Sequence, residues 1–144
     1  MTLTYLLDTN IISEPLRPAP NPTILAHIKR HQAAIAIAAI VWHELWFGCS
    51  RLPASARRTA IETYLTQVVA PAIPILAYDQ RAAEWYAQER TRLADIGKTP
   101  PFADGQIAAT AVANDLTLIT LNRDDFIVFQ GLHVEDWLTP PPHK

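Results

Sequence analysis

The sequence has little of several features that mark whole classes of proteins. Its single cysteine, Cys49, excludes an internal disulfide framework and fits a reducing compartment. The longest apolar run, residues 33–42, falls short of the roughly 18 residues that a membrane span needs. The N-terminus also lacks the basic and apolar regions of a signal peptide. We therefore expect a soluble, cytoplasmic protein that makes no membrane contact.

Strong charge of one sign is also missing. The chain has 12 Lys and Arg residues against 14 Asp and Glu residues, so nucleic-acid binding cannot rest on bulk positive charge. Apolar residues make up 49% of the 144 residues, which is enough for a buried core in one globular domain. We expect this domain to span residues 1–138, followed by a loose, proline-rich tail at 139–144.

Short apolar runs alternate with helical patterns along the whole chain. Five strands are expected, at 3–7, 34–40, 72–76, 116–120 and 132–134. Helices are expected at 21–31, 41–49, 53–69, 79–96 and 104–114, with a short one after Asp8. Pro74 indicates that the third strand lies at a sheet edge. This alternation predicts an α/β fold, a three-layer α/β/α domain with a mostly parallel sheet of four to five strands.

Acidic and amide side chains stand where these strands are expected to end. Asp8 follows the first strand, and Glu44 lies about one helical turn after the second. Asn122 and Asp125 follow the fourth strand. Because parallel strands end at the same edge of a sheet, these residues are expected to converge there. Asp104 joins them if the helix that it starts begins at that edge.

Clustered carboxylates raise one another's proton affinity, and a divalent cation removes this conflict. Mg²⁺ and Mn²⁺ prefer oxygen ligands and can activate water for phosphodiester hydrolysis. Each acid also has a purely structural interpretation. Asp8 and Asp104 can cap the helices that follow them, whereas Glu44 and Asp125 can be solvated surface residues.

Five segments resemble, in this order, the PIN-domain ribonucleases, and above all the VapC-type toxins of bacterial toxin–antitoxin pairs. The segments are LLDTNIIS (6–13), VWHELWFG (41–48), FADGQIAATA (102–111), LITLNRDDF (118–126) and GLHVEDW (131–137). The resemblance implies an endoribonuclease that hydrolyses RNA phosphodiester bonds with Mg²⁺, for which Mn²⁺ can substitute. It also implies a cognate antitoxin protein as partner and a homodimer.

The family's acidic residues carry over onto Asp8, Glu44 and Asp104, and Asp104 is expected both to cap its helix and to serve the metal. The fourth position falls on Asn122, a neutral residue, and Asp125 nearby is the alternative ligand. This departure leaves the number of metal ions open. The resemblance also implies small polar residues around the acids, which are Thr9, Asn10, Ser13 and Thr120.

Other functions fit the sequence less well. A catalytically weak PIN-like module that binds RNA or protein is the main alternative, and Asn122 supports it. Phe47 stands where the H-E-x-x-H motif of metalloproteases needs its second histidine. Ser13 lacks the G-x-S-x-G elbow of a hydrolase nucleophile. A phosphotransfer domain would need two acids after its first strand, where this chain has only Asp8.

The sequence alone does not decide the role of three surface features. His27 and His31 have metal-ligand spacing, but basic neighbours indicate a solvated helix face. The amphipathic run 51–65 is either an ordinary solvated face or a surface for RNA phosphates or an antitoxin. One helix is also crowded with aromatic side chains that could line a dimer or antitoxin groove, namely Trp42, Trp46 and Phe47.

Overall fold

The computed structural model of the chain describes residues 2–141. Its central sheet has the strand order β3-β2-β1-β4-β5, and all neighbouring strands run parallel. The strands are β1 (Tyr5–Leu7), β2 (Ile35–Ala38), β3 (Ile75–Leu76), β4 (Thr117–Ile119) and β5 (Val134–Glu135). Leu6 and Leu7 in the middle strand are fully buried, as expected of a strand covered on both faces. The predicted parallel α/β sheet is confirmed in its five-stranded form.

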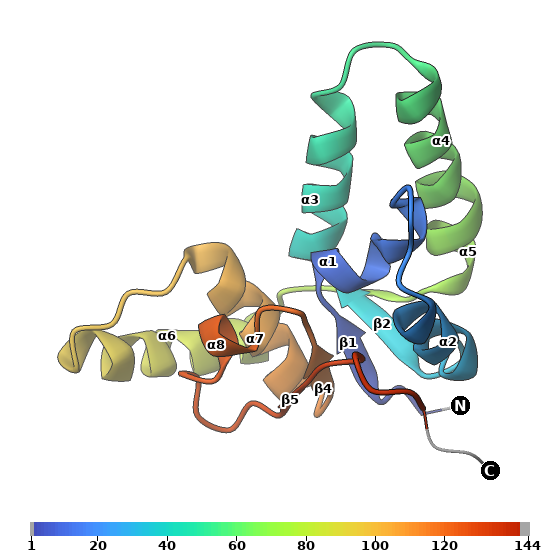
Figure 1. Cartoon of the computed structure of the whole chain (residues 1–144). Helices are drawn as coiled ribbons and strands as arrows, with labels where there is room; N and C mark the ends of the chain where they lie inside the picture. Colours follow the sequence, from blue (N-terminus) through green and yellow to red (C-terminus); the bar gives the residue numbers. More distant parts are fainter. Residues whose placement is uncertain (1, 142–144) are drawn as a thin grey trace.

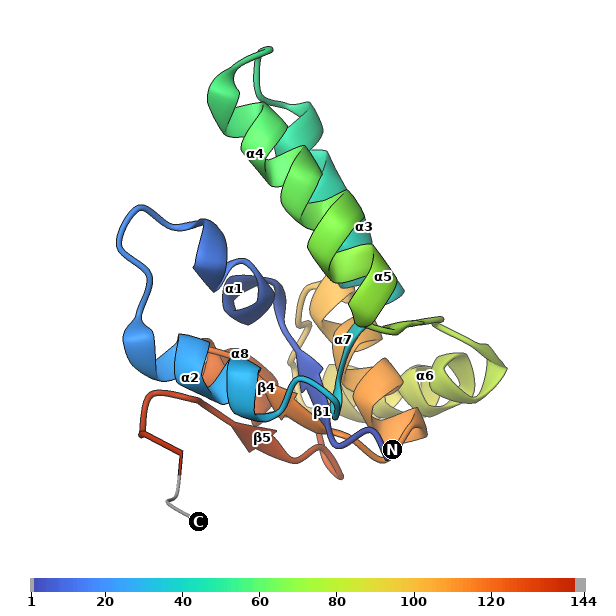
Figure 2. The same cartoon turned by 90° about the vertical axis from the view of Figure 1, so that its right-hand side faces the viewer.

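Helices cover both faces of this sheet. They are α1 (Thr9–Ile12), η1 (Glu14–Leu16), α2 (Pro22–Arg30), α3 (Ala39–Ser50), α4 (Ala56–Tyr64), η2 (Leu65–Val69), α5 (Ala70–Ala72), α6 (Gln80–Asp95), α7 (Phe102–Ala113) and α8 (Arg123–Phe126). Figure 2 shows α2 on one side of the strands and α6 with α7 on the other, so the three layers are present. In Figure 1, α3 and the α4–α5 segment form a hairpin that projects beyond the sheet.

Several helix boundaries follow from local chemistry. Asn21 caps α2, because its side-chain oxygen accepts hydrogen bonds from the backbone N–H groups of Thr23 and Ile24. Asp79 caps α6 in the same way. Gly97, with a φ of +76°, follows the end of α6 in the left-handed conformation that favours glycine. All three residues behave as the sequence predicts.

Three predicted element boundaries are wrong. The helix expected at 53–69 passes through the π-helical turn η2 and continues to Ala72, so β3 begins only at Ile75. Residues 123–126, for which no helix is expected, form the short helix α8. Helix α7 begins at Phe102, two residues before Asp104. Pro101 precedes this start, and its fixed φ suits entry into a helix. Asp104 therefore lies in the first turn and is not the cap.

Helices α6 and α7 approach each other closely at one glycine. A Cβ atom added to Gly105 would lie 1.9 Å from Cζ of Tyr86, a residue of α6 that is buried. Only glycine fits this close contact. Because Asp104 precedes Gly105, the contact fixes the carboxylate-bearing turn of α7 against the rest of the domain.

The prediction of a solvated histidine face is wrong for His27. This residue is buried, and its ring stacks on Trp137 with a centroid distance of 5.0 Å. Its Nε2 atom also hydrogen-bonds the carbonyl oxygen of Thr139, which joins the first residue of the predicted tail to α2. Residues 142–144 of the predicted tail lie outside the described residues. No helix within residues 2–141 is long and apolar enough to cross a membrane.

Candidate active site

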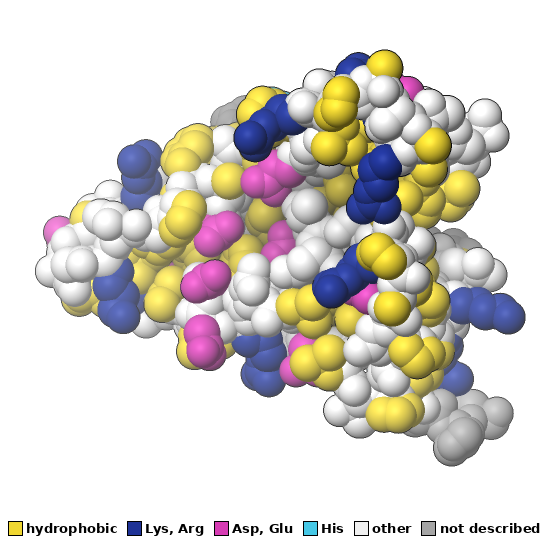
Figure 3. Space-filling model, turned by 45° about the horizontal axis from the view of Figure 1, so that its top comes forward, with side chains coloured by type: hydrophobic (Ala, Val, Ile, Leu, Met, Phe, Trp, Pro, Cys, Tyr) yellow, Lys and Arg dark blue, Asp and Glu magenta, His cyan; other side chains and the backbone are white. Residues whose placement is uncertain are grey.

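One cleft of about 500 Å³ opens at the carboxyl ends of the strands. Ile107 and seven of the residues predicted from the sequence line it, namely Asp8, Thr9, Asn10, Ser13, Glu44, Asp104 and Asn122. Figure 3 shows this side of the molecule, where acidic side chains gather in a hollow that is bordered by Lys and Arg side chains. The structure thus places these predicted residues together, although they come from four separate parts of the chain.

Asp8 lies at the end of the central strand and is buried. One carboxylate oxygen, Oδ1, accepts a hydrogen bond from the backbone N–H of Thr9 at 2.8 Å and caps α1. The other, Oδ2, accepts from the Thr120 hydroxyl at 2.7 Å. Burial raises the pKa of Asp8, these two hydrogen bonds oppose the rise, and the negative charges of Glu44 and Asp125 add to it. Asp8 therefore both caps α1 and lines the cleft.

Glu44 projects from α3 into the same cleft. Its Oε1 atom accepts a hydrogen bond from the Thr9 hydroxyl at 2.9 Å. Thr9 therefore bonds both Asp8, through its backbone, and Glu44, through its side chain. The Ser13 hydroxyl in turn donates to the carbonyl oxygen of Thr9 at 2.6 Å. These small polar residues fix the directions of two of the acids.

Asp104 shows the strongest electrostatic conflict in the cleft. Partial burial raises its pKa to about 6, and the charges of Asp8, Asp125 and Glu44 contribute in that order. The carboxylate lies in the first turn of α7, where the helix dipole favours negative charge. Burial and the three neighbouring acids oppose this favourable dipole.

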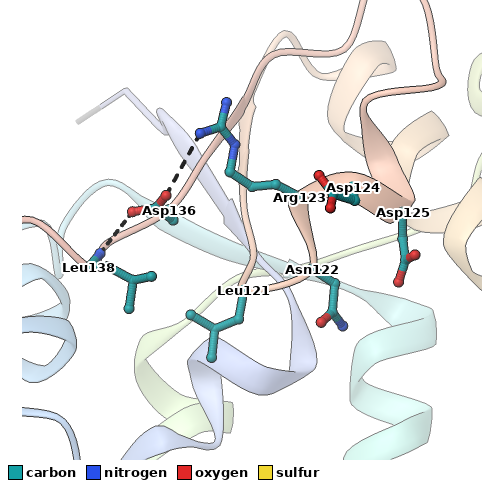
Figure 4. Close-up of a pocket in the computed structure, with 7 residues that line it drawn as sticks. All are labelled: Leu121, Asn122, Arg123, Asp124, Asp125, Asp136 and Leu138. Carbon is teal, nitrogen blue, oxygen red and sulfur yellow. Dashed lines mark hydrogen bonds and ion pairs between the residues drawn. The ribbon is translucent and has the colours of Figure 1, made fainter.

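The segment after β4 brings Asn122 and Asp125 to the edge of the cleft. The backbone N–H of Asn122 donates to the Thr120 hydroxyl at 3.0 Å, and the backbone N–H of Leu121 donates to Asn10 Oδ1 at 3.3 Å. Figure 4 shows the side chains of Asn122 and Asp125 extending to the same side of α8, whereas that of Asp124 extends away. Asn122 lines the cleft directly, while Asp125 acts on the other acids through its charge.

The donor set fits a hard divalent cation. Carboxylate and amide oxygens are the ligands of Mg²⁺ and Mn²⁺, and the pKa values of Asp8 and Asp104 are raised first by burial and then by neighbouring negative charge, which a cation would balance. Within residues 2–141, however, no three Asp, Glu, His or Cys side chains are close enough as placed to hold a metal ion. In this arrangement Thr9 and Thr120 bond Asp8, and Thr9 also bonds Glu44.

The family model described as PIN domain matches residues 5–131. The chain belongs to the PIN domain family. This PIN domain is 37% identical over 135 residues to Toxin FitB of Neisseria gonorrhoeae, covering 92% of this chain and 97% of that protein. It is 36% identical over 124 residues to VapC ribonuclease Y4jK of Sinorhizobium fredii, covering 84% and 89%. The crystal structure of FitAcB from Neisseria gonorrhoeae matches with a TM-score of 0.83 at 34% identity, covering 93% and 98%.

A second groove of this PIN domain adjoins the cleft, and the sequence indicated only some of the residues that line it. It has a volume of about 250 Å³ and shares Thr9, Ser13 and Glu44 with the cleft. Arg17 and Arg57 line its other side. Arg57 lies in the amphipathic run that the sequence singled out, but Arg17 was missed. Arg17 directly follows η1, whose Leu16 carbonyl oxygen accepts a hydrogen bond from Arg57, and a contact between such distant residues leaves no local signal in the sequence.

Proposed function

We propose that this PIN domain is a divalent-metal-dependent endoribonuclease that acts in the cytoplasm as the toxin of a toxin–antitoxin pair. One observation carries the proposal. Asp8, Glu44 and Asp104 come from three separate elements and line a single cleft, and their charges oppose one another there. The relatives named as a VapC ribonuclease and as a toxin support the activity and the biological role.

The proposed ligands of the ion are Asp8, Glu44, Asp104 and Asp125. Mg²⁺, or Mn²⁺ in its place, would supply an activated water and balance the charge that develops on the RNA phosphate. Thr120 and Thr9 hold the Asp8 carboxylate by hydrogen bonds, and Thr9 also orients Glu44. Two of the four proposed ligands, Asp8 and Glu44, are therefore held by hydrogen bonds before substrate arrives, which reduces the ordering that the reaction requires.

We assign different tasks to the two candidates for the fourth position. Asp125 supplies the fourth negative charge, because its charge already reaches both Asp8 and Asp104. Asn122 lines the cleft and supplies a neutral oxygen and amide that can orient a water or a phosphate. The neutral side chain at 122 therefore does not itself make the domain an inactive binding module.

The surfaces around the cleft suit two protein partners. The second groove carries Arg17 and Arg57 beside apolar residues, and we propose it as the surface for the antitoxin. Phe47 on α3 is 56% exposed, unlike its half-buried neighbours Trp42 and Trp46. An exposed aromatic side chain of this size fits a protein interface, and we propose that it belongs to the homodimer contact.

The proposed activity is tested with purified protein, total cellular RNA and Mn²⁺. Cleavage is expected for the native chain, and EDTA or the Asp8→Asn substitution should abolish it. Asp125→Asn removes the charge of a proposed ligand, and Asp124→Asn is its matched control. Both acids lie on α8, but only the side chain of Asp125 extends to the cleft side (Figure 4). RNA that is bound but left intact under all Mn²⁺ conditions would favour the binding-module alternative.

A further inference from the structure

We propose that Glu89 and Arg92 on α6 are positioning residues that hold α8, and with it Asp125, at the edge of the cleft. This inference rests on the proposed function, because it assigns Asp125 a ligand's role. Neither residue lines the cleft. Their connection to it runs through the turn that follows α8.

The two side chains form a compact pair in which Glu89 is buried and Arg92 is half-buried. Glu89 is 7% exposed, and its Oε1 accepts from Arg92 Nε at 2.9 Å. Its Oε2 accepts from Arg92 Nη2 and from the backbone N–H of Gln130, both at 2.6 Å. Arg92 Nη2 also donates to the carbonyl oxygen of Val128 at 2.9 Å. The pair thus binds two backbone groups of one turn through charge-assisted hydrogen bonds, which are among the stronger ones in proteins.

Helix α8 needs such an anchor because it is only four residues long. A single turn of helix is unstable by itself, so its direction depends on what holds its two ends. At the start, Asn122 is bonded to Thr120, whose hydroxyl also bonds Asp8. At the other end, Phe126 is buried, and its carbonyl oxygen accepts from the backbone N–H of Phe129. The turn that Glu89 and Arg92 bind therefore continues directly from α8.

The charge of the pair also favours this role. The hydrogen bond from Arg92 is the main cause that lowers the pKa of Glu89, with smaller contributions from Gln130 and the charge of Arg92. The carboxylate therefore stays ionised wherever the cleft acids titrate. Removing Arg92 would leave the buried Glu89 carboxylate without its main partner, which costs more than losing an exposed ion pair.

The test measures Mn²⁺ binding by calorimetry without RNA. Glu89→Ala is expected to weaken binding by about three- to tenfold, below the roughly 10–100-fold typical of residues that bond a ligand directly. Glu89→Gln keeps an acceptor for Gln130 but loses the charge, so its effect should lie between native and Glu89→Ala. Glu84→Gln is the control, because Glu84 lies on the same helix, is exposed and bonds only the Gln80 side chain in the described structure. It should bind Mn²⁺ as the native chain does.

A double-mutant cycle separates positioning from a general loss of stability. If Glu89 acts through Asp125, Glu89→Ala should weaken Mn²⁺ binding in the native background and have no further effect in an Asp125→Asn background. Equal weakening in both backgrounds, or unchanged binding in Glu89→Ala, would overturn the proposal. If Glu89→Ala does not fold, Glu89→Gln takes its place in the cycle with the same expectation. Asp8→Asn distinguishes a failure of the metal site, because native-like Mn²⁺ binding in that variant would refute the site and this inference together.

Discussion

Replacing Asp104 by asparagine should stabilise the protein in the absence of divalent ions. The pKa of Asp104 in the folded domain is about 6, against an ordinary value of 3.8. The folded state therefore binds more protons than the unfolded state between these two values, and stability falls as the pH rises through them. Above about pH 7 this loss is complete, and Asp104→Asn removes it because the amide carries no charge.

The size of the effect follows from the same two values. At 1.36 kcal/mol per pH unit, the difference between about 6 and 3.8 sets a ceiling of about 3 kcal/mol. Solvent screening lowers this figure because Asp104 is only partly buried. The lost interaction with the dipole of α7 subtracts a further 0.3–1 kcal/mol or so. A net gain of about 1–2 kcal/mol remains, equivalent to a rise in Tm of roughly 2–8 °C.

Urea denaturation of the native chain and of Asp104→Asn in EDTA measures this gain. The two curves should lie close together near pH 4 and separate progressively up to about pH 7. Mn²⁺ should then stabilise the native chain more than the variant, so that the order reverses. A variant that is less stable than the native chain in EDTA at neutral pH, or a difference that does not depend on pH, would refute the electrostatic reasoning.

Four further substitutions test other parts of the structure. Asp8→Asn should abolish RNA cleavage yet keep the fold, because asparagine can still cap α1 and meet the Thr120 hydroxyl; circular dichroism and a cleavage assay check both halves. Asn122→Asp should tighten Mn²⁺ binding by about three- to tenfold, and Asp125→Ala should weaken it, as calorimetry will show. Gly105→Ala should lower Tm by several degrees, since its Cβ would overlap a buried ring and overpacking costs about 1–3 kcal/mol.

Much of the fold and of the cleft could be predicted because both depend on local patterns. Apolar runs of strand length alternate with capped helical segments, and this alternation is enough to indicate a parallel sheet. Once the strands are parallel, the residues that follow them must meet at one edge, which brings Asp8 and Glu44 together. Asn21 and Asp79 were predictable as caps for the same reason, since a cap acts within three residues of itself.

The features that were missed depend on distant partners. His27 looked solvated because its sequence neighbours are basic, but Trp137 and Thr139, from the far end of the chain, cover it. Glu89 and Arg92 were not singled out in the sequence, because their bonds to the backbone of residues 128–130 join distant parts of the chain. The start of α7 was misplaced because an acid before an apolar stripe resembles a cap, whereas the proline three residues earlier sets the start.

The position of β1 at the centre of the sheet affects how the protein folds during its synthesis. Asp8 directly follows β1, the first strand to be synthesised. The Thr120 hydroxyl that donates to it lies 112 residues later in the chain. Tyr5 pairs with Ile35 on one side and with Thr117 on the other. A chain still being translated, or ended early by a stop codon, therefore leaves the central strand open along one edge. The acids line one cleft only when nearly the whole chain has left the ribosome, so the proposed site is completed late in synthesis.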